Sequence, residues 1–214
     1  MAEVFFSTYG GLFVSAFVSL FVVVDPLGTS AVFISLTKNM DDRQKNTIAL
    51  KAVTIAFGLL LFFSLLGHWV LQYMGVSLDA FRIAGGILLF VTAFRMIMGF
   101  HDPDQLESEK STYKDRSEIA VFLLAIPLLS GPGVMTAVLM FATAAGTITG
   151  YMLVMGAVFL VLLISYICLW GANRLSKIFG QVGNSIIARV MGILLAAMAI
   201  QFIADGTKTI LFNS

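Results

Sequence analysis

The segment AIPLLSGPG, residues 125–133, places two prolines and two glycines within seven residues of a strongly apolar stretch. Proline removes a backbone donor and clashes with the preceding helical turn, and glycine adds backbone freedom. A continuous helix through Gly131-Pro132-Gly133 is therefore not expected. The segment predicts a helix that stops and restarts inside an apolar region.

A second segment of the same kind, VVVDPLGTS at residues 22–30, lies deep in the first apolar stretch. Its Asp-Pro-Leu-Gly sequence again predicts an interruption. The two restarting helices are expected to begin near Thr29–Ser30 and near Gly133–Thr136. Unpaired backbone groups are costly in lipid, so both interruptions should face protein or a water-filled cavity.

The composition is that of a membrane protein. Hydrophobic residues make up 59% of the 214 residues and charged residues 12%, with a mean hydropathy of +0.96, whereas soluble domains average about 45–50% and about 25%. A spanning helix needs roughly 20 apolar residues. Six segments meet this requirement: Phe6–Thr37, Ala49–Met74, Ser77–Phe100, Glu118–Ala145, Thr149–Ala172 and Ser185–Phe212.

The basic residues predict the orientation. Eleven of the 13 Lys and Arg residues lie in or beside the connections after the first, third and fifth segments, and only Arg82 and Lys208 lie on the other side. Because Lys and Arg accumulate in cytoplasmic loops, we expect a bacterial-type inner-membrane protein with both termini outside.

The chain also carries an internal repeat at an offset of 106 residues. PLGTSAV at residues 26–32 aligns with PGVMTAV at 132–138, and GILL at 86–89 aligns with GILL at 192–195. Each copy holds three spans, an odd number, so the second copy must enter the membrane from the opposite side. The expected fold is an all-α membrane protein of six helices in two inverted repeats, residues 1–100 and 118–214, joined by a cytoplasmic linker at 101–117. Helices 1 and 4 are expected to be broken near mid-membrane.

Paired breaks in inverted repeats indicate the binding site of a secondary transporter. Free N–H groups at a helix start suit an anion, and the carbonyls of the preceding half-helix suit a cation. A small zwitterion satisfies both. The glycines present little side-chain bulk for contact, which favours a small substrate over a large one. The predicted substrate-binding residues are Pro26, Gly28, Thr29, Ser30, Ser130, Gly131, Pro132, Gly133 and Thr136.

Asp25 is the carboxylate placed well inside a span, and its repeat equivalent is Gly131. A buried charge in the bilayer usually marks an ion, proton or substrate path, so Asp25 is predicted to couple transport to an ion. The alternative is a structural carboxylate that caps the broken backbone at Thr29 or Ser30. Arg95, near a span end, is read as an interfacial anchor.

The sequence offers little support for other classes. The single cysteine, Cys168, builds neither a disulfide nor a metal site alone, and no nucleotide-binding loop is present. We expect no catalytic residues, metal, cofactor or nucleic acid, and a protein that is not an enzyme. The alternatives are an exporter or channel for another small solute, or an intramembrane enzyme that uses Asp25. Flux direction, the coupling ion (a proton or sodium) and the oligomeric state stay open.

Four motifs together carry a family resemblance: DPLGTSAVF at residues 25–33, RIAGG at 82–86, AIPLLSGPG at 125–133 and RVMGILL at 189–195. In order and spacing they resemble the MarC family. The resemblance implies a six-span inner-membrane protein with inverted repeats, and SnatA-like transport of small neutral amino acids such as glycine and alanine. It places the substrate region around Pro26, Gly28 and residues 130–133. The chain departs from the family pattern in two places, since Asp25 stands where Asn is frequent and Ala31 where proline is frequent.

Overall fold

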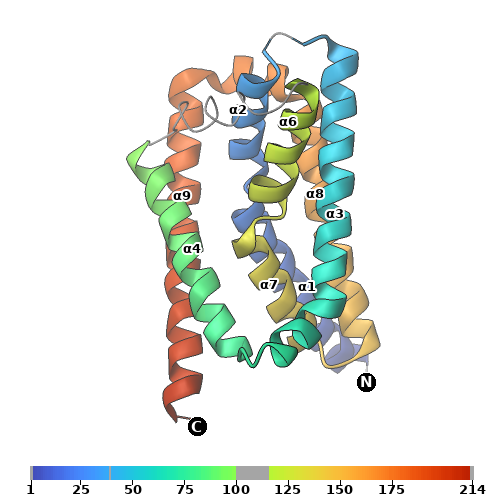
Figure 1. The fold of residues 1–214 in the computed structure, drawn as a ribbon, viewed down its shortest axis with the longest axis vertical. Coiled ribbons are helices and arrows are strands. Elements are labelled where there is room, and N and C mark those ends of the chain that lie inside the picture. The colour runs from blue at the N-terminus through green and yellow to red at the C-terminus, as the bar shows by residue number, and fades with distance from the viewer. Residues whose placement is uncertain (1, 39, 100–115, 213–214) are drawn as a thin grey trace.

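A computed structural model describes residues 2–38, 40–99 and 116–212 of the chain (Figure 1). These residues form helices and no strand. The elements are α1 (Ala2–Val24), α2 (Pro26–Leu36), α3 (Asp42–Tyr73), α4 (Leu78–Met98), α6 (Arg116–Leu123), the π-helix η1 (Leu124–Leu129), α7 (Pro132–Ala144), α8 (Ile148–Trp170) and α9 (Ala172–Phe212).

Five helical segments in the described residues are long and apolar enough to cross a membrane: Tyr9–Leu36, Asp42–Tyr73, Leu78–Met98, Ile148–Trp170 and Ser185–Phe212. Together they confirm an all-helical, multi-pass membrane protein. The predicted fourth span is instead built from three short pieces, α6, η1 and α7, of which α7 is a shorter apolar helix. A count of six complete crossings remains a prediction.

Two boundaries differ from the expected ones. Helix α3 begins at Asp42 rather than Ala49, because Asp41 and Gln44 form a capping box. The Gln44 N–H donates to Asp41 Oδ1 at 2.6 Å, and the Asp41 N–H donates to Gln44 Oε1 at 3.3 Å. This reciprocal pair satisfies two amides that the helix start would leave free, so polar residues extend the helix beyond its apolar part.

The sequence predicts a non-helical connection between Ala172 and Ser185, and this prediction is wrong because the segment is helical. Helix α9 begins at Ala172 and continues to Phe212. The sequence between carries apolar residues at positions 175, 178, 179 and 182, the spacing of one helical face. Polar residues between them concealed this periodicity. The predicted linker at 101–117 lies outside the described residues, except that Arg116 and Ser117 begin α6.

The connections between helices and the two termini lie at two opposite ends of the bundle (Figure 1). The α2–α3 connection and the α8–α9 junction lie at one end, called here the basic end because Arg43, Lys45, Arg95 and Arg174 belong to it. The α3–α4 and α7–α8 connections lie with both termini at the other end, called the terminal end.

Among the described helices, α4 and α9 share the most extensive packing contact, and they run antiparallel (Figure 1). Gly86 of α4 lies against Ala199 and Ile203 of α9, and Gly192 of α9 lies against Ala93 and Ile97 of α4. A Cβ at Gly86 would stand 2.9 Å from the Ala199 carbonyl oxygen. Small residues therefore allow close backbone approach here, as at many helix interfaces in membranes.

Candidate functional site

The first interruption centres on Asp25, which separates α1 from α2. Its φ of 45° is left-handed, and it is the one non-glycine residue with positive φ in the described part of the chain. Aspartate tolerates this conformation better than most residues. The Gly28 N–H donates to Asp25 Oδ1 at 3.1 Å, so the carboxylate caps α2. The alternative prediction had Asp25 capping the backbone at Thr29 or Ser30. In the structure the capped N–H is that of Gly28.

The backbone around this interruption is only partly satisfied by its own helix. Pro26 has no N–H, so the Val22 carbonyl loses its usual helical donor. The Thr29 hydroxyl donates to the Val24 carbonyl at 3.1 Å, and the Ser30 hydroxyl donates to the Leu27 carbonyl at 2.6 Å. The Val24 and Leu27 carbonyls thus have hydroxyl donors, and the Val22 carbonyl is the acceptor near Asp25 that has lost its helical donor.

The second interruption has a different construction. Residues Leu124–Leu129 widen into a π-helix, and the Ser130 N–H and hydroxyl both donate to the Ala125 carbonyl, at 2.9 and 2.7 Å. Helix α7 then starts at Pro132, and its N-cap, Gly131, provides no side-chain cap. The amides of the first turn of α7 are consequently left open to an outside acceptor.

Both interruptions line one cavity of about 480 Å³. This volume falls within the range of about 300–1,000 Å³ typical of ligand sites. Six of the predicted site residues line it: Asp25, Gly28 and Thr29 from the first interruption, and Gly131, Pro132 and Gly133 from the second.

The other four predicted residues, Pro26, Ser30, Ser130 and Thr136, are not among its lining residues. The hydroxyls of Ser30 and Ser130 are used by backbone carbonyls, as described above. The Thr136 hydroxyl likewise donates to the Pro132 carbonyl at 2.8 Å, and its side chain packs against Gly85 of α4. These hydroxyls shape the breaks and do not face the cavity.

Helices α4 and α9 supply the remaining walls, which the sequence reasoning missed. Leu89, Thr92 and Arg95 of α4 line the cavity, together with Ala188 and Leu195 of α9. The three α4 residues are spaced three apart, which places them on one helical face. That spacing was the available signal, but Arg95 was read only as an interfacial anchor.

The cavity carries opposite charges at different depths. Asp25 is 9% exposed and lies at the interruption, whereas Arg95 is exposed and lies in the last turn of α4. Ion pairing of Arg95 is not found within the described residues. Those residues also contain no cluster of His, Cys, Asp or Glu suited to a metal ion.

The cavity between the two interruptions is called here the central cavity. Five described helical segments long and apolar enough to cross a membrane define a multi-pass integral membrane protein. The chain belongs to the MarC family, because the family model described as MarC family integral membrane protein matches residues 10–211. This match confirms the resemblance seen in the four sequence motifs.

Relatives from distant organisms match almost the whole chain. A UPF0056 membrane protein of Methanocaldococcus jannaschii is 38% identical over 196 residues, covering 92% of this chain and 96% of its own length. UPF0056 membrane proteins of Aquifex aeolicus and Escherichia coli K12 are 35% and 37% identical, covering 95% and 91% of both partners. No solved structure matches the chain significantly.

Proposed function

We propose that the protein is a secondary transporter of small neutral amino acids, of the glycine and alanine class, and that it works by alternating access. The observation that carries the proposal is the shared cavity, which is lined by Asp25, Gly28 and Thr29 on one side and by residues 131–133 on the other. Interrupted backbone at membrane depth is tolerated where it lines a cavity, and facing half-helix ends are suited to binding a solute.

The two interruptions offer complementary partners for a zwitterion. At α2 the Asp25 carboxylate already occupies the helix start, whereas the equivalent position at α7 is Gly131, which leaves the start uncapped. A substrate carboxylate therefore fits the first turn of α7, where the helix dipole is positive. Its ammonium group then faces Asp25 and the carbonyl end of α1.

Several contacts support the inverted-repeat part of the proposal. Leu89 and Leu195, which are equivalent at the offset of 106, line the same cavity from α4 and α9. The Gly86 contacts with Ala199 and Ile203 are mirrored by Gly192 with Ala93 and Ile97, the equivalent residues with the repeats exchanged. Such reciprocal pairs are expected from a two-fold relation between repeats.

The position of the cavity suggests which side is open. From the interruptions it extends along α4 to Arg95, which lies in the last turn of that helix, at the basic end. On the other side, α4 touches α7 where Gly85 meets Thr136. Access would alternate if this α4–α7 contact opened while the basic side closed. With the basic end cytoplasmic in a bacterial-type inner membrane, as the charges predict, this conformation faces inward.

Flux measurements test the proposal. Purified protein in proteoliposomes is expected to exchange labelled glycine or alanine, with saturation and with counterflow against unlabelled substrate. Imposed proton or sodium gradients then identify the coupling ion. Absence of flux under every gradient, with folded protein, would contradict transport, and flux that neither saturates nor shows counterflow would indicate a channel.

Leu89 is expected to limit substrate size. It is 4% exposed, lines the cavity, and lies where a Cβ on Gly133 would collide with it. Leu89→Ala should raise uptake of valine relative to glycine by roughly tenfold or more, since each methylene of pocket space is worth about 10- to 200-fold in selectivity. It should also lower the unfolding free energy by about 2–5 kcal/mol.

The matched control is Leu194→Ala, because Leu194 is 46% exposed on α9 and does not line the cavity. It should leave the valine-to-glycine ratio unchanged. An unaltered ratio in folded Leu89→Ala protein would remove Leu89 from the substrate site.

A further inference from the structure

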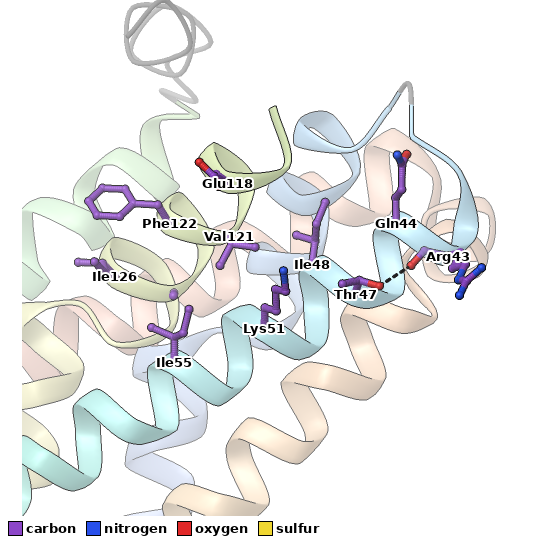
Figure 2. Close-up of a pocket in the computed structure, with 11 residues that line it drawn as sticks. Arg43, Gln44, Thr47, Ile48, Lys51, Ile55, Glu118, Val121, Phe122 and Ile126 are labelled. Atoms are coloured by element: carbon purple, nitrogen blue, oxygen red, sulfur yellow. Dashed lines mark hydrogen bonds between the residues drawn. The ribbon is translucent and has the colours of Figure 1, made fainter. Parts of the chain in front are cut away.

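A second cavity, of about 440 Å³, lies between α3 and the α6–η1 segment (Figure 2). We call it the α3–α6 cleft. Its polar lining includes Thr47, Lys51 and Glu118, and its apolar lining includes Ile55, Phe122 and Ile126. None of these residues lines the central cavity, so the cleft is a separate feature and does not depend on the transport proposal.

Lys51 is the amine that enters this cleft. Figure 2 shows its side chain rising from α3 into the space beside α6, next to Ile48 and Val121. It lies nine residues beyond the start of α3, which corresponds to roughly 14 Å along the helix. Its neighbours at positions 49, 50, 52 and 53 are apolar, and no ion pair to Lys51 is found among the described residues. Because the predicted apolar span begins at Ala49, Lys51 lies just inside its border near the basic end, where a lysine is stabilised by a counter-ion or by reaching the interface.

The deeper part of the cleft is apolar and faces outward. Ile55, Phe122 and Ile126 are 43%, 45% and 37% exposed. On a membrane-spanning surface this exposure is to the bilayer, where space between helices is filled by acyl chains. An amine above an apolar groove matches the layout of a phospholipid, whose phosphate lies above its chains.

The charges of the cleft favour one class of phospholipid. Lys51 and Arg43 are the basic lining residues and Glu118 is the acidic one, so basic residues outnumber acidic ones in the lining as a whole. Figure 2 places Arg43 at the rim, directed away from Lys51, so the excess positive charge lies at the mouth of the cleft and Lys51 is the basic residue beside the apolar groove. Basic pockets between membrane helices bind anionic headgroups.

We propose that the α3–α6 cleft binds one anionic phospholipid, with its phosphate on Lys51 and an acyl chain along Ile55, Phe122 and Ile126. The lipid joins α3 to α6, which continues into the π-helix and the second interruption. Its binding should therefore stabilise the folded protein.

Lipid binding to the full chain in neutral detergent tests this proposal. Phosphatidylglycerol should raise the Tm more than phosphatidylcholine, and native mass spectrometry should retain one phosphatidylglycerol. Lys51→Met should weaken this binding about fivefold, because one basic residue near an anionic headgroup raises the affinity by about that factor. Glu118→Gln should strengthen it, an outcome that misfolding cannot produce.

The matched control is Lys45→Met, since Lys45 lies on the same helix and lines a different cavity. It should retain the affinity of the unmodified chain. If Lys45→Met weakened lipid binding as much as Lys51→Met, the binding would depend on general surface charge and the proposal would be overturned. Equal stabilisation by phosphatidylcholine, or by inorganic phosphate at the same concentration, would also overturn it.

Discussion

Replacing Gly85 with alanine is expected to lower the unfolding free energy by about 1–3 kcal/mol, the usual range for overpacking a close contact. A Cβ at Gly85 would collide with Thr136 Oγ1 and would stand 2.6 Å from Thr136 Cβ. Thr136 is 1% exposed and β-branched, so it has few other rotamers. The strain can be relieved only by moving α4 away from α7. Thermal or denaturant unfolding in detergent measures the change.

Gly58→Ala is the matched control for this prediction. Gly58 lies inside α3, and nothing stands within 4 Å of the Cβ that alanine would add. Alanine is the better helix former, so this variant should be unchanged or more stable by up to about 1 kcal/mol. Thr136→Gly in the Gly85→Ala background should restore space and recover part of the loss. Equal effects at positions 85 and 58 would show that the α4–α7 contact is not tight.

The same variant bears on the transport cycle. If the α4–α7 contact closes the terminal side, spreading it should favour the conformation open on that side. Thiol labelling of cysteines introduced along α7 toward Ala144 would then increase in Gly85→Ala. Unchanged labelling, with the expected loss of stability, would leave Gly85 with a packing role and would place the gate elsewhere.

Much of this fold could be predicted from local features of the sequence. Apolar length defines the spans, and proline and glycine place both interruptions within a residue or two of where they occur, at Asp25 and at Gly131. These effects depend on one proline ring or one missing Cβ, so no tertiary information is needed. The helix starting at Ala172 was missed because polar residues interrupt its periodicity and tertiary packing decides such segments.

The site was less predictable for a related reason. Ser30, Ser130 and Thr136 were predicted to bind substrate, and in the structure their hydroxyls donate to backbone carbonyls of their own segments. A hydroxyl beside a break can donate to a backbone carbonyl or bind a solute. Its rotamer and the neighbouring helix decide between these two roles. Arg95 and Leu89 were not predicted to line the cavity, since only the packing of α4 against both interruptions brings them there.

Asp25→Asn should separate the structural role of this side chain from its charge. Asparagine retains a carbonyl oxygen for the Gly28 N–H and also tolerates the left-handed backbone at φ 45°. The helix start should therefore persist, with a Tm near that of the unmodified chain. Substrate counterflow should also persist, with a raised KM, because the substrate ammonium loses the facing charge of Asp25 while the first turn of α7 and the carbonyl end of α1 are unchanged. Accumulation driven by an ion gradient should fall by at least tenfold, since the titratable or ion-binding charge is gone.

Asp25→Ala removes the charge, the cap and the tolerance for positive φ together. Loss of the cap alone is worth about 0.5–2 kcal/mol, and the left-handed conformation adds about 1–2 kcal/mol for a residue with a plain Cβ. This variant should be clearly less stable than Asp25→Asn and should lose exchange as well as accumulation. If Asp25→Asn instead kept full gradient-driven accumulation, the carboxylate would be a helix cap and the coupling ion would bind elsewhere. If it abolished counterflow in folded protein, the charge would be indispensable for binding the substrate ammonium, because the cap and the backbone are the features that asparagine preserves.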